Sequence, residues 1–174
     1  MLINFLPLHP SHFPLLLKWL ETPHVKRWWD ADIAWTQALI EEKYGDYVQG
    51  YKIMEGVAKP LKACIICVDE QLVGYIQLYN AHDFLPEATL TGLPESLGAF
   101  DVYIGEESCL QKGLGSQAID QFLNTFGSAY ASIFADPDRE NIAAIRAYEK
   151  AGFQAVPNQP EGHEVWMLRP ILCP

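Results

Sequence analysis

Two closely spaced glycines, Gly113 and Gly115, stand in the segment QKGLGSQAID of residues 111–120, between an apolar run and a helical pattern. Small residues let the backbone approach a phosphate group, and the start of a helix presents N–H groups without partners inside the helix. The segment matches neither the GxxxxGK[ST] nor the GxGxxG phosphate-binding pattern. Its spacing therefore leaves two interpretations open, a phosphate-binding loop and an ordinary turn between a strand and a helix.

A second segment that could carry chemistry is DRENIAAIRAYEKAGF, residues 138–153. Asn141, Ala144 and Tyr148 recur at intervals of three and four residues, which places them on one face of the predicted helix. A tyrosine there could donate a proton in a reaction, or it could only pack the helix against a sheet. By helical spacing alone, packing is the favoured interpretation.

Hydrophobic periodicity predicts the elements that must position these residues. Leu15, Leu16, Trp19 and Leu20 indicate a helix near the N-terminus, with Ser11 as its N-cap. We also expect an amphipathic helix in residues 33–48, strands in residues 61–69 and 71–80 joined by a turn at Glu70, and a loop in residues 81–98.

The second half of the chain alternates between strand and helix patterns. We expect strands in residues 98–105, 130–135 and 162–170, and helices in residues 115–126 and 139–153, the latter ended by Gly152. This order predicts one mixed α/β domain spanning residues 1–174, a length that suits a single hydrophobic core.

The composition limits the classes of partner that the chain can have. The formal net charge is −10, and 49% of the residues are hydrophobic. Binding to nucleic-acid phosphates needs a basic face, so we expect no nucleic-acid partner. We find no run of about 18 apolar residues and no signal-peptide pattern, and we therefore expect a cytoplasmic protein with no membrane span. The acidic balance suits a cationic partner, or solubility alone.

The cysteines are Cys64, Cys67, Cys109 and Cys173. Cys64 and Cys67 form a CxxC pattern, but they lie in an apolar, strand-like run in which residues three apart point to opposite faces. Neither a second CxxC nor a well-spaced histidine pair completes a zinc site. We expect buried, reduced cysteines and no bound metal.

Adjacent tryptophans cannot both face the core from one helix, so we expect one of Trp28 and Trp29 to pack and the other to line a substrate cleft. Trp35 and Trp166 are expected in the core. His24 is interpreted as a structural histidine on a turn.

Together, the glycine segment and the helix after it resemble the GNAT family of acyl-CoA-dependent N-acyltransferases. The family's phosphate loop has the form Q/R-x-x-G-x-G/A. Gly113 and Gly115 match it, and Leu110 stands where Gln or Arg is usual. The family's next helix carries N-x-x-A-x-x-x-Y-x-K-x-G-F, which is complete here in Asn141, Ala144, Tyr148, Lys150, Gly152 and Phe153.

The resemblance extends over nearly the whole chain. The segment LLLKWLETPHVKRWW, residues 15–29, is similar to the opening of the aminoglycoside 6′-N-acetyltransferases and of a neighbouring branch that acylates hydroxylysine in siderophore synthesis. The segments VGYIQLY, FDVYIG, ADPDRENIAAIRAYEKAGF and PEGHEVWM also resemble stretches of the aminoglycoside enzymes, in the same order.

The resemblance implies a single GNAT-like domain, with a twisted mixed sheet flanked by helices and a splayed cleft for acetyl-CoA. Backbone groups of the strand DVYIG would hold the pantetheine arm, and amides of the glycine loop would hold the pyrophosphate. The residues implied to bind this cosubstrate are Val102, Tyr103, Ile104, Gln111, Lys112, Gly113, Leu114, Gly115, Ser116, Asn141, Ala144, Tyr148 and Lys150.

The family's reaction is the direct attack of a neutral amine on the thioester, without an acyl-enzyme. The resemblance implies that Tyr148 protonates the leaving thiolate. It also implies that Asp101, at the start of its strand, binds the ammonium and accepts its proton. The alternatives are a packing role for Tyr148 and a solvated or turn-capping Asp101.

A small cationic amine is the acceptor that the resemblance implies, with the 6′-amine of an aminoglycoside as the expected substrate. Carboxylates favour such a polycation by Coulomb attraction and hydrogen bonding. The residues implied to contact it are Trp28, Trp29, Gln77, Asp83, Asp101, Asp136 and Glu161. Each acid taken singly could also be a solvated surface residue.

Two alternatives remain open. The chain could be a GNAT enzyme for another amine, such as hydroxylysine or a protein N-terminus, and the loop from Ala81 to Gly98 would decide this because it builds the acceptor side. It could instead be a non-catalytic module that binds acyl-CoA. A monomer and a homodimer are both compatible with the sequence.

Overall fold

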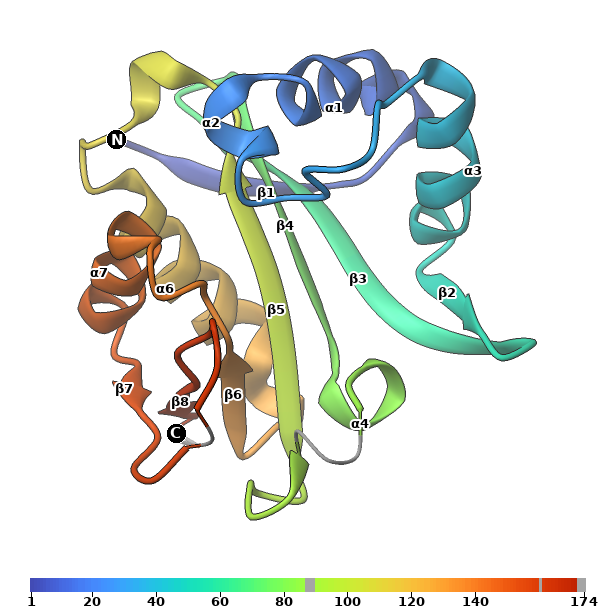
Figure 1. Ribbon diagram of the computed structural model, residues 1–174. Helices are drawn as coiled ribbons and strands as arrows, with labels where there is room; N and C mark the ends of the chain where they lie inside the picture. The colour runs from blue at the N-terminus through green and yellow to red at the C-terminus, as the bar shows by residue number, and fades with distance from the viewer. Residues whose placement is uncertain (87–89, 160, 172–174) are drawn as a thin grey trace. The chain divides into compact units, whose positions relative to one another are not determined.

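The computed structural model describes residues 1–86, 90–159 and 161–171, which form helices and a mixed β-sheet (Figure 1). Hydrogen bonds join the strands in the order β1-β3-β4-β5-β6-β8-β7, and β2 pairs with β3. β5 and β6 are parallel, whereas β1–β3 and β6–β8 are antiparallel, so the predicted mixed α/β fold is confirmed. The strands are β1 (Ile3–Pro7), β2 (Tyr51–Met54), β3 (Val57–Val68), β4 (Gln71–Asn80), β5 (Leu97–Ile104), β6 (Ser132–Ala135), β7 (Gln154–Ala155) and β8 (Met167–Pro170).

The described chain divides into two compact units, which are Met1–Gln77 with Val102–Lys112, and Leu78–Asp101 with Gly113–Pro174. The first unit holds the 3-10 helices η1 (Pro10–His12) and η2 (Glu107–Cys109) and the helices α1 (Phe13–Leu20), α2 (Pro23–Lys26) and α3 (Gln37–Val48). The second unit holds α4 (Ala81–Phe84), α6 (Leu114–Phe126), η3 (Gly127–Ala129) and α7 (Ile142–Lys150).

Hairpins with two-residue turns shape the first unit. β3 and β4 are joined at Asp69 and Glu70, whose φ angles of 46° and 70° are those of a tight hairpin turn, as predicted. β2 and β3 are joined in the same way at Glu55 and Gly56, with φ angles of 50° and 79°. This second hairpin was not predicted, and it lets β3 begin four residues before the expected strand, at Val57.

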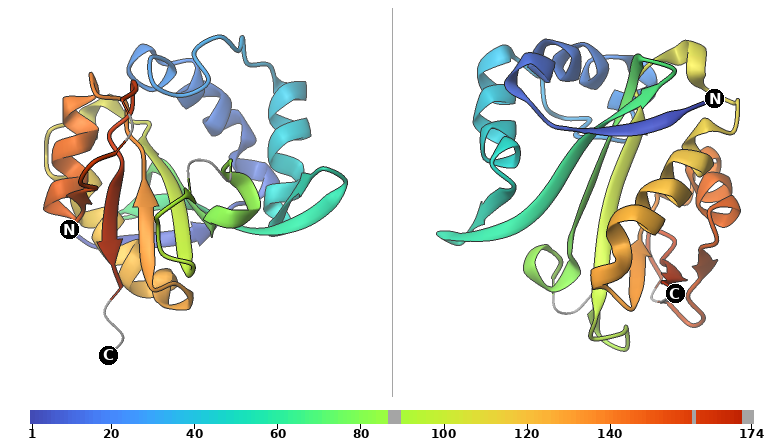
Figure 2. Two further views of the ribbon diagram at one scale, coloured as in Figure 1. Left: turned by 60° about the horizontal axis from the view of Figure 1, so that its bottom comes forward. Right: turned by 180° about the vertical axis from the view of Figure 1, so that it is seen from behind.

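The chain also begins with a strand that was not predicted, because its apolar pattern is short and ends in a proline-rich segment. β1 pairs with β3, with Ile3 opposite Val68 and Pro7 opposite Cys64. The views of Figure 2 show β1 lying beside β3.

The first helix starts later than expected, and the prediction of Ser11 as its N-cap is wrong. Ser11 lies inside η1, where its hydroxyl contacts His9 Nδ1 at 2.9 Å, and His12 is the N-cap of α1. The paired histidine side chains of His9 and His12 cap the 3-10 turn and leave no capping role for the serine. α3 begins after Thr36, whose hydroxyl accepts from the Leu39 N–H at 3.3 Å.

In the second unit, α6 buries a stripe of side chains and contacts α7 (Figure 2, right). The stripe consists of Leu114, Ala118, Ile119, Phe122 and Leu123, at helical spacing. α7 ends as predicted, with Gly152 at a φ of 90°. The N–H groups of Gly152 and Phe153 bond the carbonyls of Glu149 and Tyr148, which closes the last turn. The loop predicted for residues 81–98 contains the helical turn α4.

Buried side chains include most of the residues that were expected inside. Cys64 and Cys67 are buried and unpaired, as predicted, and burial raises the pKa of the Cys64 thiol to about 11. Cys109 is half-buried, and Cys173 lies outside the described residues. Trp35 is buried, whereas Trp166 is only half-buried and lies edge-on to Phe134, with ring centroids 6.0 Å apart.

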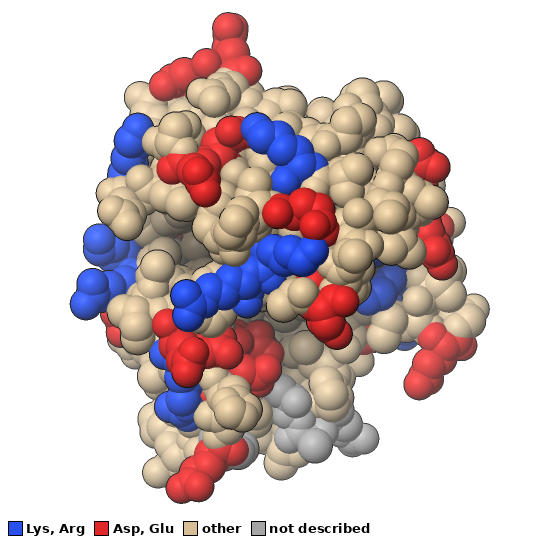
Figure 3. Space-filling model, turned by 45° about the horizontal axis from the view of Figure 1, so that its top comes forward, with Lys and Arg blue, Asp and Glu red and all other residues tan. Residues whose placement is uncertain are grey.

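Figure 3 shows lysine and arginine side chains lying beside acidic ones on one face of the molecule. The first unit contains such pairs, Lys18–Glu106 and Lys26–Glu21, each with a nitrogen–oxygen distance of 2.7 Å. In the described part of the chain, every helix is too short or too polar to cross a membrane. Those same residues hold no cluster of three or more His, Cys, Asp or Glu arranged to bind a metal ion.

Candidate active site

Three of the predicted site residues come together in the second unit, each from a different element. Asp101 is on β5, Asp136 directly follows β6, and Tyr148 is on α7. The ring of Tyr148 packs against the rings of Phe100 and Phe153, with centroids 5.4 Å and 5.8 Å away. The expectation that Asp101 starts its strand is wrong, since β5 begins at Leu97 and places Asp101 well inside it.

The electrostatics of this group favour neutral side chains. Burial, followed by the carboxylates of Asp101 and Glu164, raises the pKa of Asp136 to about 6. Burial, followed by the carboxylates of Asp101 and Asp136, raises the pKa of Tyr148 well above its ordinary value. Tyr148 therefore keeps its proton at neutral pH and can donate it, while a cation beside the two aspartates would relieve their repulsion.

Glu164 belongs to this group although the sequence did not single it out. The segment before β8 pairs with the segment after β6: the Val165 N–H donates to the Pro137 carbonyl at 2.9 Å, and Asp138 and Glu164 form a β-bridge. This pairing brings Glu164 into the field of Asp136. The strand expected in residues 162–170 already contains Glu164, although β8 itself begins only at Met167, and what the sequence pattern lacks is the pairing of Glu164 with Asp138.

The structure does not join Glu161 to this group. Glu161 is exposed, and the carboxylates that raise the pKa of Asp136 are those of Asp101 and Glu164. Asp83 lies in α4, where its charge acts on Tyr130, whose pKa is raised first by burial and then by Asp83. Both acids belong to the second unit.

The glycine loop has the backbone geometry that a phosphate-binding loop needs. Gly113 is the N-cap of α6 with a left-handed φ of 73°, and a glycine at this position has no side chain to bond the N–H groups of the first turn. The Ser116 hydroxyl donates to the Gly113 carbonyl at 3.0 Å, so it does not cover the N–H groups of the first turn. A Cβ at Gly115 would meet the Ala147 Cβ of α7 at 4.0 Å, an ordinary van der Waals distance.

Asn141 has a structural partner. It is the N-cap of α7, and its Oδ1 accepts from the Ala144 N–H at 3.2 Å. Lys150, the last residue of α7, is exposed. The motif that identified this helix therefore contains a capping residue as well as Tyr148.

The first unit carries an aromatic cluster that includes other predicted site residues. Trp29 lies edge-on to Tyr103, with centroids 4.9 Å apart, and Tyr103 stacks on Tyr75 at 5.5 Å. The Tyr75 hydroxyl donates to Gln77 Oε1 at 2.6 Å, and Gln77 is buried. Trp28 is exposed and lies under the Arg27 guanidinium at 4.7 Å. Both tryptophans follow α2, which ends at Lys26.

The end of β5 in the first unit is also held by side chains. The Ile104 carbonyl lies 2.9 Å from His24 Nε2, and Tyr103 is buried. A Cβ at Gly74 would overlap the Tyr103 carbonyl, so only glycine lets the neighbouring backbone come this close. The backbone groups predicted to hold a pantetheine arm thus sit in a tightly packed segment.

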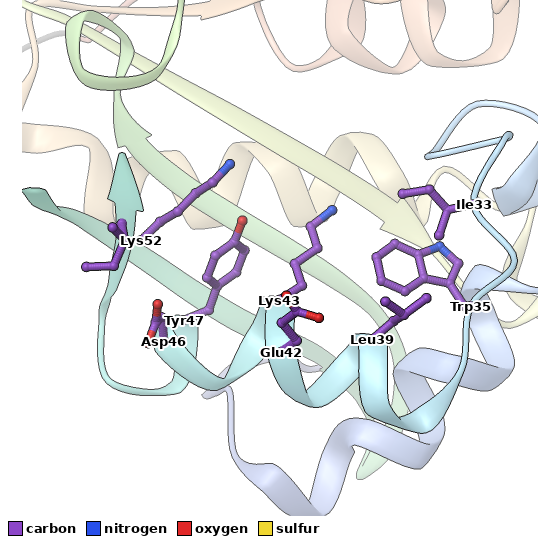
Figure 4. A pocket seen from close by; sticks show the side chains of 9 residues that line it. Ile33, Trp35, Leu39, Glu42, Lys43, Asp46, Tyr47 and Lys52 are labelled. Atoms are coloured by element: carbon purple, nitrogen blue, oxygen red, sulfur yellow. The ribbon is translucent and has the colours of Figure 1, made fainter. Parts of the chain in front are cut away.

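A pocket of about 410 Å³, which no sequence pattern predicted, lies along α3 and β2 (Figure 4). Lys43 points into this region and pairs with Asp30 at 2.7 Å, with its Nζ 5.1 Å from the centroid of the Trp35 ring. The lining residues are Ile33, Trp35, Leu39, Glu42, Lys43, Asp46, Tyr47, Lys52 and Ile53. The charged residues of this lining are two acids and two lysines.

Comparison with known proteins identifies relatives for nearly the whole chain. Residues 9–159 match the family model described as "Acetyltransferase (GNAT) domain". An aminoglycoside N(6′)-acetyltransferase type 1 of Klebsiella pneumoniae is 29% identical over 164 residues, which cover 89% of this chain and 76% of that protein.

Solved structures share the fold. The aminoglycoside acetyltransferase AAC(6′)-Ib in complex with ribostamycin and coenzyme A is similar, with a TM-score of 0.78, 24% identity and coverage of 97% of this chain and 93% of that chain. RimL, a ribosomal-protein alpha-N-acetyltransferase solved with coenzyme A, has a TM-score of 0.72 at 14% identity, with coverage of 97% and 94%.

Proposed function

The chain belongs to the GNAT family of acetyltransferases, and we propose that it transfers the acetyl group of acetyl-CoA to the 6′-amine of an aminoglycoside. The observation that carries the proposal is the group of Asp101, Asp136 and Tyr148, two carboxylates beside a protonated phenol. An ammonium group is the ligand that two repelling carboxylates favour, and a buried phenol is a proton donor for a leaving thiolate.

In this proposal Asp101 binds the acceptor ammonium and takes its proton, directly or through water. Asp136 and the neighbouring carboxylate of Glu164 add negative charge, which favours an acceptor with more than one amine. Tyr148 keeps its proton until the thiolate leaves. Trp28, Trp29, Gln77, Asp83 and Glu161 are proposed as further acceptor contacts, to be tested by substitution.

Acetyl-CoA fits the residues of the glycine loop. The uncapped first turn of α6 and the left-handed Gly113 supply N–H groups of the kind that bind pyrophosphate. When bound, the cosubstrate supplies the acetyl group. We propose that it is held by Val102, Tyr103, Ile104, Gln111, Lys112, Gly113, Leu114, Gly115, Ser116, Asn141, Ala144, Tyr148 and Lys150.

The test is an assay of CoA release with acetyl-CoA and a panel of amines: kanamycin, tobramycin, hydroxylysine and a peptide with a free N-terminus. We expect turnover with the aminoglycosides, and acetylation of the 6′-nitrogen by mass spectrometry and NMR. Turnover with hydroxylysine or the peptide alone would show that the acceptor is that amine and not an aminoglycoside. Binding of acetyl-CoA without turnover of any amine would favour a non-catalytic module.

A further inference from the structure

Side chains from α1 and α2 hold the segment between the end of β5 and η2 in the first unit. We call Lys18, Trp19 and His24 the N-terminal clamp. Lys18 Nζ and Trp19 Nε1 both donate to Glu106 Oε1, at 2.7 Å and 2.8 Å. The clamped segment leads directly along the chain into the glycine loop that begins at Gln111.

His24 is the member of the clamp that contacts the backbone. Its Nε2 lies 2.9 Å from the Ile104 carbonyl, and a carbonyl oxygen can only accept, so Nε2 carries a proton and donates it. Its Nδ1 lies 3.5 Å from Glu107 Oε1. The imidazole of His24 therefore contacts one residue before Gly105 and one residue after it.

Gly105 is fixed between these contacts. A Cβ at this position would overlap the Trp19 ring, so the backbone lies directly against the indole. The N–H groups of Gly105 and Glu106 both donate to the Val73 carbonyl, at 2.8 Å and 3.2 Å. Backbone bonds thus hold this segment on β4, and the clamp sets which way the Ile104 carbonyl and the Glu107 side chain face.

We propose that His24 is a positioning residue for the acyl donor, through its hydrogen bond to the Ile104 carbonyl. The inference rests on the proposed function, which assigns the backbone at Ile104 and the loop after η2 to acetyl-CoA. His24 touches neither the reacting atoms nor the acceptor in this assignment. Its loss should therefore weaken donor binding and leave the chemical step intact.

Three single variants separate this role from simple stability. His24→Leu removes both nitrogens, whereas His24→Gln keeps an N–H donor that can reach the Ile104 carbonyl. Lys26→Met is the matched control, because it breaks the Lys26–Glu21 pair on the same short helix without touching the clamp. Binding of acetyl-CoA is measured by calorimetry without acceptor, and KM and kcat are measured with the acceptor that the wild type turns over.

We expect His24→Leu to raise the Kd and KM for acetyl-CoA about tenfold, as the loss of a part-buried hydrogen bond would, while kcat stays within about twofold. His24→Gln should restore most of the affinity, and Lys26→Met should match the wild type. Equal donor affinity in His24→Leu and wild type would overturn the proposal, as would the absence of rescue by glutamine. A wild type that does not bind acetyl-CoA would overturn the proposed function itself.

A double-mutant cycle with Glu107→Gln covers the case in which His24→Leu fails to fold. Glu107 is largely exposed, with 71% of its side chain accessible, so its substitution leaves the core unchanged. We expect Glu107→Gln to weaken acetyl-CoA binding about twofold in the wild type and to have no effect in His24→Gln. Additive effects of the two changes would show that the two residues act separately and would contradict the clamp.

Discussion

The ring of Tyr148 packs edge-on against the ring of Phe100, the residue before Asp101, with centroids 5.4 Å apart. The phenol of α7 is thus fixed by the same strand that carries the candidate base. Packing and chemistry are therefore separable at this position, because phenylalanine would keep the ring contact and remove only the hydroxyl.

Tyr148→Phe tests the role of that hydroxyl. We expect kcat to fall about a hundredfold, the low end of the range for a general acid, while the melting temperature and the Kd for acetyl-CoA change little. Stopped-flow CoA release measures kcat, and scanning and titration calorimetry measure the melting temperature and the Kd. An unchanged kcat would leave Tyr148 with its packing role alone.

Asp136 should make the stability of the protein depend on pH. Its pKa is raised from 3.8 to about 6 in the folded state, so between those values the folded protein binds more protons than the unfolded chain. The free energy of unfolding therefore falls as the pH rises through this window, and the full cost remains above pH 6. Asp136→Asn removes the cost, so the variant should melt higher than the wild type at pH 7.5.

Thermal melts of Asp136→Asn and wild type at pH 7.5 and near pH 4 check this sign, because the difference should vanish once the wild-type carboxyl is protonated. Asp32→Asn, a substitution of an exposed residue of the first unit, serves as the control.

Asp136→Asn should also raise the KM for an aminoglycoside without changing the KM for acetyl-CoA. A variant less stable at pH 7.5 would contradict the assignment.

Asn141 should be more important for stability than its place in the family motif suggests. Asn141→Ala removes the acceptor of the Ala144 N–H, and we expect a loss of about 1 kcal/mol in the free energy of unfolding. Asn141→Asp keeps the cap and should keep the stability, as urea unfolding would measure. If acetyl-CoA binding falls in the aspartate variant while stability is retained, Asn141 also contacts the donor.

Gly113→Ala and Gly45→Ala are the same chemical change with opposite expected effects. At Gly113 the left-handed φ of 73° disfavours a Cβ, so alanine should cost about 1 kcal/mol and weaken acetyl-CoA binding. At Gly45, inside α3, an added Cβ meets nothing within 4 Å, and alanine should stabilise by about 0.5–1 kcal/mol. Urea unfolding and calorimetry on both variants test the contrast.

Local patterns predicted the long elements and missed the short strands β1 and β2. α6 and α7 carry clear apolar or motif spacing, and the β3–β4 hairpin has a continuous apolar run on each side of its turn. β1 and β2 are only five and four residues long, and each is held by its pairing with β3. Neither pairing leaves a periodic signal in the strand's own residues.

The candidate site shows the same division. Asp101, Asp136 and Tyr148 were found because each stands inside a recognisable stretch, and the structure brings them together. Glu164 was missed because its place beside Asp136 depends on the register between the segments after β6 and before β8. Glu161, three residues earlier in the same segment, is exposed, and the pKa of Asp136 is raised by Glu164 instead.

The burial of the cysteines also decides how the protein would respond to alkylating reagents. The Cys64 thiol, with a pKa of about 11, holds almost no thiolate at neutral pH, and Cys67 is also buried in β3. Among the described cysteines, the half-buried Cys109 in η2 is the one a maleimide would reach first. A fluorophore attached there would sit just ahead of the glycine loop and would serve as an optical reporter of what that loop binds.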